Sequence, residues 1–174
     1  MKKLTNFLII ALMSLAMVPV TSAHIPTTTT VAAWQNQDVF THQDAGVQFQ
    51  LPKGWKAKPD GEVITASSAD DALQVVFWVP DENSFDAAVK ELDKELSKTI
   101  KNMKSEGQPS KDTLNGMPHY GETGTGDVNG ATIVWSVDVL GAKKPLIILT
   151  FAAPQLFEKN ADAYERLLSS IKKI

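Results

Sequence analysis

Cysteine is absent from this chain of 174 residues. Without a thiol, the protein can form no disulfide, thiolate zinc site or iron–sulfur cluster, and it has no cysteine to which a lipid could be attached. Arginine is almost absent as well, since Arg166 is the only one. The chain therefore cannot build the cluster of arginines that commonly recognises phosphate groups.

Signatures of catalysis are equally scarce. No Gly-x-Ser-x-Gly segment is present to mark the nucleophile of a serine hydrolase. Residues 121–126 (GETGTG) lack the Lys-Ser or Lys-Thr ending of a phosphate-binding loop, and their glycines favour an irregular hairpin strand. His24, His42 and His119 show no helical metal-ligand spacing and are expected at the surface or at strand edges. We therefore predict that the protein is no enzyme and has no cofactor or metal.

The formal net charge is −3 at pH 7. It becomes −5 if the first 23 residues are removed, because Lys2 and Lys3 are lost with them. An acidic surface repels phosphate backbones and anionic lipid head groups. Nucleic acid is therefore not expected as a partner.

The N-terminus has the three-part layout of a secretory signal peptide. Lys2 and Lys3 are followed by an apolar run over residues 7–20 and by small residues at 21–23. The run is shorter than the roughly 20 residues that a membrane-spanning helix needs. We expect cleavage between Ala23 and His24, location in the periplasm or outside the cell, and no stable membrane anchor.

Three segments follow from this reading: a signal peptide over 1–23, a flexible threonine-rich leader over 24–38, and a single α+β domain over 39–174. Alternating or continuous apolar residues predict strands at 47–51, 62–67 and 73–79. Helical spacing predicts helices over 84–104 and 160–173, with Ile100 and Met103 on the apolar face of the first and Gly107 just beyond its end. Asn-Gly pairs at 115–116 and 129–130 predict hairpin turns. These turns bracket a strand at 117–128, and strands at 131–140 and 145–152 follow, joined by a turn over 141–144. The three strands form an antiparallel meander.

Hairpin connections predict a mostly antiparallel sheet. The strands at 73–79 and 146–151 are apolar on both faces, so the sheet should be covered on both sides. The expected fold class is thus α+β, an α/β/α sandwich in which helices cover a mostly antiparallel sheet.

This layout resembles the PsbP-like fold, which includes an extrinsic subunit of photosystem II, a small Ran-binding nuclear import factor and the DcrB-like bacterial envelope proteins. The segment AGVQFQLPKGW at 45–55 resembles the opening strand and Pro-x-Gly-Trp turn of that fold. The long helix after Pro80 and the closing YERLLSSI at 164–171 are similar in position. The resemblance implies work in binding or assembly and no shared catalytic residue. Unlike the lipid-anchored DcrB-like proteins, this chain has no cysteine.

We therefore predict a non-enzymatic periplasmic protein that binds or assists another envelope protein or peptide. A small-ligand binder with a pocket between sheet and helix is one alternative, and an enzyme with an unrecognised site is another. Trp55 and Trp34 are the candidate binding residues, because an indole in a turn or leader can anchor a partner.

Export should depend on the apolar run at 7–20, which must enter the secretion channel. Leu12→Arg should leave the full-length chain in the cytoplasm, whereas the exported wild-type protein should begin at His24. Mass spectrometry of the intact protein from the cell envelope measures both. An exported chain that still begins with Met1 would contradict the predicted cleavage.

Overall fold

The computed structural model describes residues 39–174. The signal peptide, the leader, Trp34 and His24 lie outside the described residues, so their predictions remain predictions. Within 39–174, neither helix has the length and apolar character needed to cross a membrane.

Two antiparallel sheets and two helices make up this part of the chain. The larger sheet has the order β3-β4-β5-β10-β9-β8-β6, and β7 also pairs with β8. Its strands are β3 (Lys56–Asp60), β4 (Val63–Ser67), β5 (Gln74–Trp78), β6 (Lys101–Ser105), β7 (Ser110–Leu114), β8 (Met117–Val128), β9 (Ala131–Gly141) and β10 (Pro145–Ala152). The smaller sheet contains β1 (Val39–His42), β2 (Val47–Gln50) and β11 (Lys172–Lys173) in the order β1-β2-β11. The helices are α2 (Phe85–Leu96) and α3 (Pro154–Ser169).

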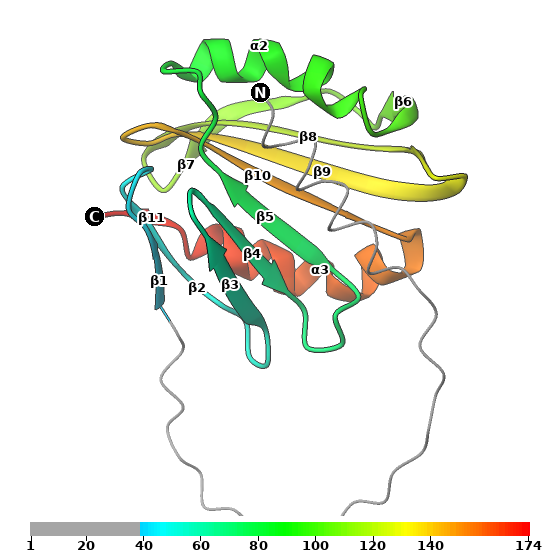
Figure 1. The fold of residues 1–174 in the computed structure, drawn as a ribbon, viewed down its shortest axis with the longest axis horizontal. Helices are drawn as coiled ribbons and strands as arrows, with labels where there is room; N and C mark the ends of the chain where they lie inside the picture. The colour runs from blue at the N-terminus through cyan, green and yellow to red at the C-terminus, as the bar shows by residue number, and fades with distance from the viewer. Residues whose placement is uncertain (1–38) are drawn as a thin grey trace, which may run out of the picture.

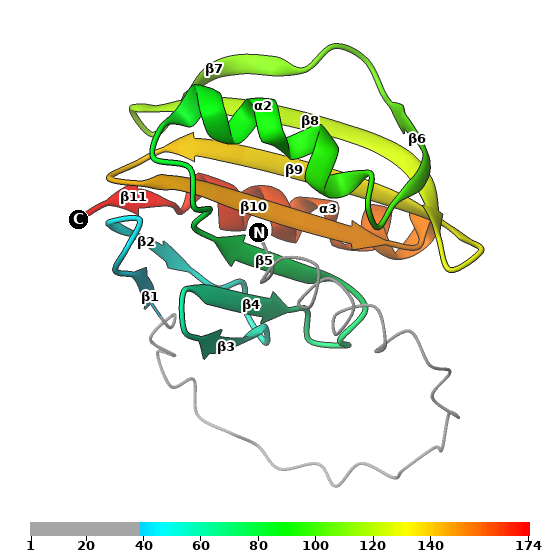
Figure 2. The ribbon, with the colours of Figure 1, turned by 45° about the horizontal axis from the view of Figure 1, so that its top comes forward.

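The helices lie on opposite faces of the larger sheet (Figures 1 and 2). Helix α2 covers one face, and α3 shares the other with the smaller sheet. Each face carries its own cluster of buried apolar side chains, which meet α2 on one side and α3, β1 and β2 on the other. The structure thus confirms the predicted α+β class, with an antiparallel sheet covered on both faces.

The alternation of side chains along β9 assigns its residues to the two layers. Trp135, Val137 and Val139 pack in the cluster beneath α2, so Ser136 and Asp138 face the α3 side. Every residue of β10 is buried, as expected for a central strand. On the α3 side, the rings of Phe49 and Phe77 stack with centroids 4.1 Å apart and join the smaller sheet to the larger one.

The predicted meander is confirmed as β8, β9 and β10. The two Asn-Gly pairs form the turns on either side of β8, one from β7 and one into β9, with positive φ at both residues of each pair. The turn from β9 to β10 lies at 142–144. The glycines of β8 do not interrupt the pairing with β9, which is in unbroken register; the irregularity lies in the pairing with β6. Instead, the glycines let the segment around β6 lie close to β8. A Cβ at Gly124 would lie 2.2 Å from the carbonyl oxygen of Lys104, and one at Gly126 would lie 2.4 Å from the Ile100 side chain.

The prediction of a helix over 84–104 was wrong at its C-terminal end. Helix α2 ends at Leu96, and the chain turns into β6, which pairs with β8. Ile100 is buried in the same cluster as α2, so the apolar spacing continues although the helix does not. Asn102 has a φ of 50°, which is incompatible with a continuing helix. Gly107 therefore lies between β6 and β7 and not beside a helix end.

The last helix begins and ends earlier than predicted. Pro154 occupies its first turn, where a missing N–H costs nothing, and Ser169 is its last residue. Ile171 is buried as expected but follows the helix. Lys172 and Lys173 then form β11, because pairing with β2 supplies hydrogen bonds that a longer helix would not.

Helix α2 should be held by its apolar side. Leu92 and Leu96 are buried on the side of α2 that packs on the sheet. The side chain of Lys94, on the same helix, is 62% exposed and forms an ion pair with Glu91 at 2.7 Å. Leu96→Ala should lower the free energy of unfolding by about 2–5 kcal/mol, whereas Lys94→Ala should change it little, because an exposed ion pair contributes little. Urea denaturation of the two variants provides the comparison. Equal effects would mean that this side of α2 does not contribute to the core.

Candidate functional site

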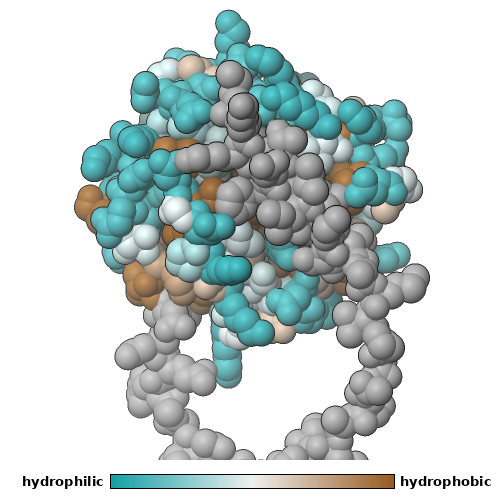
Figure 3. Space-filling model, viewed as in Figure 1, coloured by the Kyte–Doolittle hydropathy of each residue, from teal (hydrophilic) through white to brown (hydrophobic). Residues whose placement is uncertain are grey.

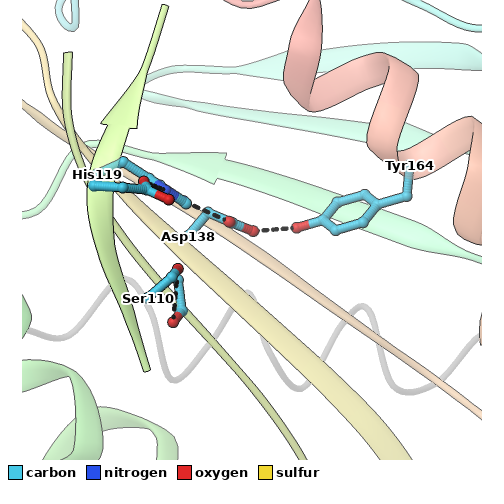
Figure 4. A network of polar contacts seen from close by, with 6 residues as sticks. Ser110, His119, Asp138 and Tyr164 are labelled. Atoms are coloured by element: carbon cyan, nitrogen blue, oxygen red, sulfur yellow. Dashed lines mark hydrogen bonds and ion pairs between the residues drawn. The ribbon is translucent and has the colours of Figure 1, made fainter. Parts of the chain in front are cut away.

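A buried carboxylate on β9 is the centre of a polar network between the larger sheet and α3. Asp138 is only 6% exposed. Its Oδ1 accepts a hydrogen bond from His119 Nε2 at 2.8 Å, and its Oδ2 accepts one from the Tyr164 hydroxyl at 2.6 Å. His119 comes from β8 and Tyr164 from α3, and the two side chains point at Asp138 from opposite sides (Figure 4). Both carboxylate oxygens are therefore engaged.

The pairing of β8 with β9 explains how His119 reaches Asp138. Gly121 lies directly opposite Asp138 in the register, two residues along β8 from His119. A Cβ at Gly121 would lie 2.7 Å from Ser110 Oγ and 3.1 Å from the imidazole carbon Cε1. The missing side chain therefore leaves the space that the imidazole occupies.

His119 is held by two carboxylates, one at each ring nitrogen. Its Nδ1 lies 2.6 Å from Oδ1 of Asp112, the residue opposite it on β7. Since ionised carboxylates only accept hydrogen bonds, the arrangement suits an imidazolium that donates from both nitrogens. The hydrogen bond to Asp138, and then that to Asp112, raises the pKa of His119 against the opposing effect of burial. Burial, followed by the charge of Asp138, raises the pKa of Tyr164 well above its ordinary value, so its hydroxyl stays protonated and donates.

A cavity of about 340 Å³ lies beside this network. Helix α3 supplies its apolar wall through Phe157, Ala161 and Leu168. Ser136 and Asp138 line it from β9. The cavity thus combines an apolar wall with a hydrogen-bonded polar one, which is typical of ligand sites.

The segment that joins β6 to β7 forms another side of the cavity. Glu106 and Gln108 line it, and Ser110 follows at the start of β7. The backbone N–H of Glu106 donates to the carbonyl of Thr123 at 2.8 Å, which fixes this segment to β8. The cavity is therefore bounded by parts of the chain that are held in place.

The polar side chains of the network are hydrogen-bonded to one another. Both nitrogens of His119 and both oxygens of Asp138 have hydrogen-bond partners within the network. Within residues 39–174, no group of three or more histidine or carboxylate side chains has the arrangement of a metal site.

The expectation that the histidines lie at the surface or at strand edges was wrong for His119 and only partly right for His42, which ends the edge strand β1 but is buried. His119 lies within the network on β8. His42 is buried, and its Nε2 donates to the carbonyl of Glu62 at 3.0 Å while its Nδ1 accepts the N–H of Ala45 at 3.4 Å. Burial lowers the pKa of His42, so it supports the turn after β1 as a neutral ring.

The structure places Trp55 apart from this site. It belongs to the apolar cluster on the α3 side and is 9% exposed. Trp55 and Arg166 line a separate hollow, also bounded by α3. Most of the indole is thus used in packing, and the role of Trp55 in binding remains a prediction, as does that of Trp34 outside the described residues.

Sequence reasoning missed Asp112, Asp138 and Tyr164 as members of a common site. One signal was present: Asp138 is the only charged residue in the otherwise largely apolar segment 131–140. A lone carboxylate in a buried strand requires a partner. The partners themselves could not be identified without the strand register and the position of α3.

Comparisons with known proteins agree with this fold. No family model and no curated protein matches the chain. Among solved structures, LpqN, described as involved in cell envelope biogenesis of Mycobacterium tuberculosis, is similar with a TM-score of 0.56 at 15% identity, over 78% of this chain and 88% of that one. Cyanobacterial PsbP (CyanoP) from Synechocystis gives 0.52 at 11% identity, over 84% and 98%.

A structure from Bacteroides thetaiotaomicron gives a TM-score of 0.53 at 14% identity over 80% of this chain, which spans about half of that protein (49%). At such identities the likeness concerns the fold alone. The chain has a PsbP-like α+β fold, and these neighbours do not establish membership of the DcrB-like family.

Raising the pH should weaken the fold through His119. Its folded pKa lies above the value of about 6.5 expected in an unfolded chain. The stabilisation from its charge is therefore fully present below about pH 6.5 and is lost as the pH rises through the folded pKa. The loss of unfolding free energy caused by His119→Gln should be larger at about pH 5.5 than at about pH 9 in urea denaturation.

His42→Gln provides a control of opposite sign. Because the folded pKa of His42 is lowered, its stabilisation is present above about pH 6.5 and is lost as the pH falls toward the folded pKa. The cost of this variant should therefore shrink in acid. A cost of His119→Gln that does not change with pH would show that the imidazole is not charged in the network.

Proposed function

We propose that the protein is an exported, non-enzymatic protein of the cell envelope that binds another envelope protein or peptide in the cavity between the larger sheet and α3. The cavity itself carries this proposal. It is concave, it has an apolar wall on α3, and its polar wall is fixed by the Asp138 network. A pre-formed site of this kind binds without paying the cost of ordering its own side chains.

A binding role is supported over catalysis by the state of the network. His119, Asp138 and Tyr164 satisfy one another, so they stiffen the wall and do not offer a base or nucleophile. The role of LpqN in envelope biogenesis gives some support to an envelope location, together with the predicted signal peptide. We also propose membership of the DcrB-like family, which is supported by the PsbP-like fold and the predicted signal peptide.

A small-ligand binder is the second candidate, and two observations favour it. Val39 and Ile174 are the only large apolar residues in 39–174 that are exposed, so this region presents no broad apolar groove. On the face shown in Figure 3, hydrophobic side chains lie in small groups separated by hydrophilic ones. A volume of about 340 Å³ lies in the range of small-molecule sites.

Filling the cavity tests the proposal. Ala161 lines it from α3, whereas Gln155 lies exposed on the same helix outside it. Ala161→Phe should abolish the crosslinked complex formed in intact cells, and Gln155→Phe, which adds the same ring elsewhere, should leave it unchanged. Affinity capture with mass spectrometry measures the complex, and thermal melts confirm that both variants fold.

Two results would contradict the proposed partner. A complex that survives Ala161→Phe would place the partner elsewhere on the molecule. Native mass spectrometry of protein isolated from the envelope that shows a small molecule, lost in Ala161→Phe but retained in Gln155→Phe, would favour the small-ligand candidate.

A further inference from the structure

The cavity beside α3 is lined by four carboxylate residues and by no lysine or arginine. The four are Glu106, Glu122, Asp138 and Glu165. The two positive side chains of α3 lie outside it: Lys159 pairs with Asp70 at 2.7 Å, and Arg166 lines the hollow with Trp55. The charge of the lining is therefore of one sign.

Two of the four carboxylates already bond to other side chains of the protein. Asp138 accepts hydrogen bonds from His119 and Tyr164. Glu122 accepts hydrogen bonds from the hydroxyls of Ser105 and Tyr120. Both acids are thus held in place by bonds within the chain, although the hydroxyls that bond Glu122 are neutral and leave its charge in place.

The other two, Glu106 and Glu165, have no such side-chain partner. Glu106 comes from the segment between β6 and β7, and Glu165 comes from α3. Both are exposed, and neither side chain has a hydrogen bond or ion pair with another part of the chain between 39 and 174. Two free negative charges thus border the cavity from different elements.

The apolar wall of the cavity provides a second feature that a ligand could contact, besides the two acids. Phe157, Ala161 and Leu168 line the cavity on α3, and Leu168 and Glu165 are three residues apart on the same side of the helix. A molecule that lies against this wall would bring one end close to Glu165. The lining therefore suits an apolar chain that ends in a positive charge.

We propose that the cavity binds an alkylammonium group, either the side chain of a lysine in a partner peptide or a free aliphatic amine. This proposal rests on the proposed function, because it names the chemistry recognised at the same site. The methylene chain contacts α3, and the ammonium donates hydrogen bonds to Glu106 and Glu165. His119 does not compete for these acids, since its two nitrogens donate to Asp112 and Asp138.

Binding of simple probes to the purified protein tests the charge requirement. The probes are hexylamine, N-acetyl-lysine methylamide, the neutral analogue hexanol and the anion hexanoate, each titrated by NMR. Both amines should bind at least about fivefold more tightly than hexanol, hexanoate should bind most weakly, and the preference should fall as salt is added. Tighter binding of the lysine derivative would identify a peptide side chain as the source, and tighter binding of hexylamine a free amine.

Matched variants locate the charge. Glu106→Gln and Glu165→Gln should each weaken binding of the amines by about two- to fivefold and leave hexanol unaffected. Glu158→Gln, an exposed residue of α3 that does not line the cavity, should have no effect. Equal affinity for hexylamine and hexanol, or failure of all the probes to bind, would overturn the proposal.

The cavity-filling variant separates failure of this proposal from failure of the proposed function. Ala161→Phe should abolish binding of hexylamine, and amine binding that survives it would place the amine outside the cavity and overturn the proposal. If the probes show no charge preference but the complex in cells is still lost in Ala161→Phe and kept in Gln155→Phe, the cavity binds a partner of different chemistry. In that case the proposed function stands and the assignment of an amine falls.

Discussion

The buried carboxylate of Asp138 is the constraint on which this side of the molecule depends. A charge in a covered sheet is costly unless donors surround it. Here the donors come from two distant parts of the chain, His119 on β8 and Tyr164 on α3. Satisfying one acid therefore fixes the lateral position of α3 on the sheet, and the position of α3 sets the width of the cavity beside it.

The two faces of the larger sheet differ in composition: one is packed with apolar side chains, and the other also carries polar residues that border the cavity. Beneath α2, an apolar cluster that includes Trp135 contributes stability by burial. On the other face, the polar residues of β9 interrupt the apolar cover and leave room for the cavity. The glycines of β8 serve both faces, because Gly124 accommodates the Trp135 ring and Gly121 accommodates the His119 ring. A strand that carried side chains at both positions could not hold this arrangement.

Much of the fold could be predicted from local pattern, and the site could not. The Asn-Gly pairs specify the turns before and after β8 by backbone conformation alone, and β10 follows from its continuous apolar run. The end of α2 was missed because Ile100 continues the helical spacing and is buried beside the helix although it lies beyond it. The network depends on the register of β7, β8 and β9 and on the docking of α3, none of which periodicity encodes. Asp138 alone stood out, as a charge in an apolar strand.

The pairing of β11 with β2 has a consequence for the order in which the chain can fold. Gln50 and Ser170, which bond where α3 leads into β11, are 120 positions apart in the sequence. While the ribosome is still making the residues between them, β2 has only β1 as a partner in the smaller sheet, and the apolar surface around Phe49 has no cover from α3. The nascent chain therefore exposes the apolar surface around Phe49 until α3 and β11 have been synthesised.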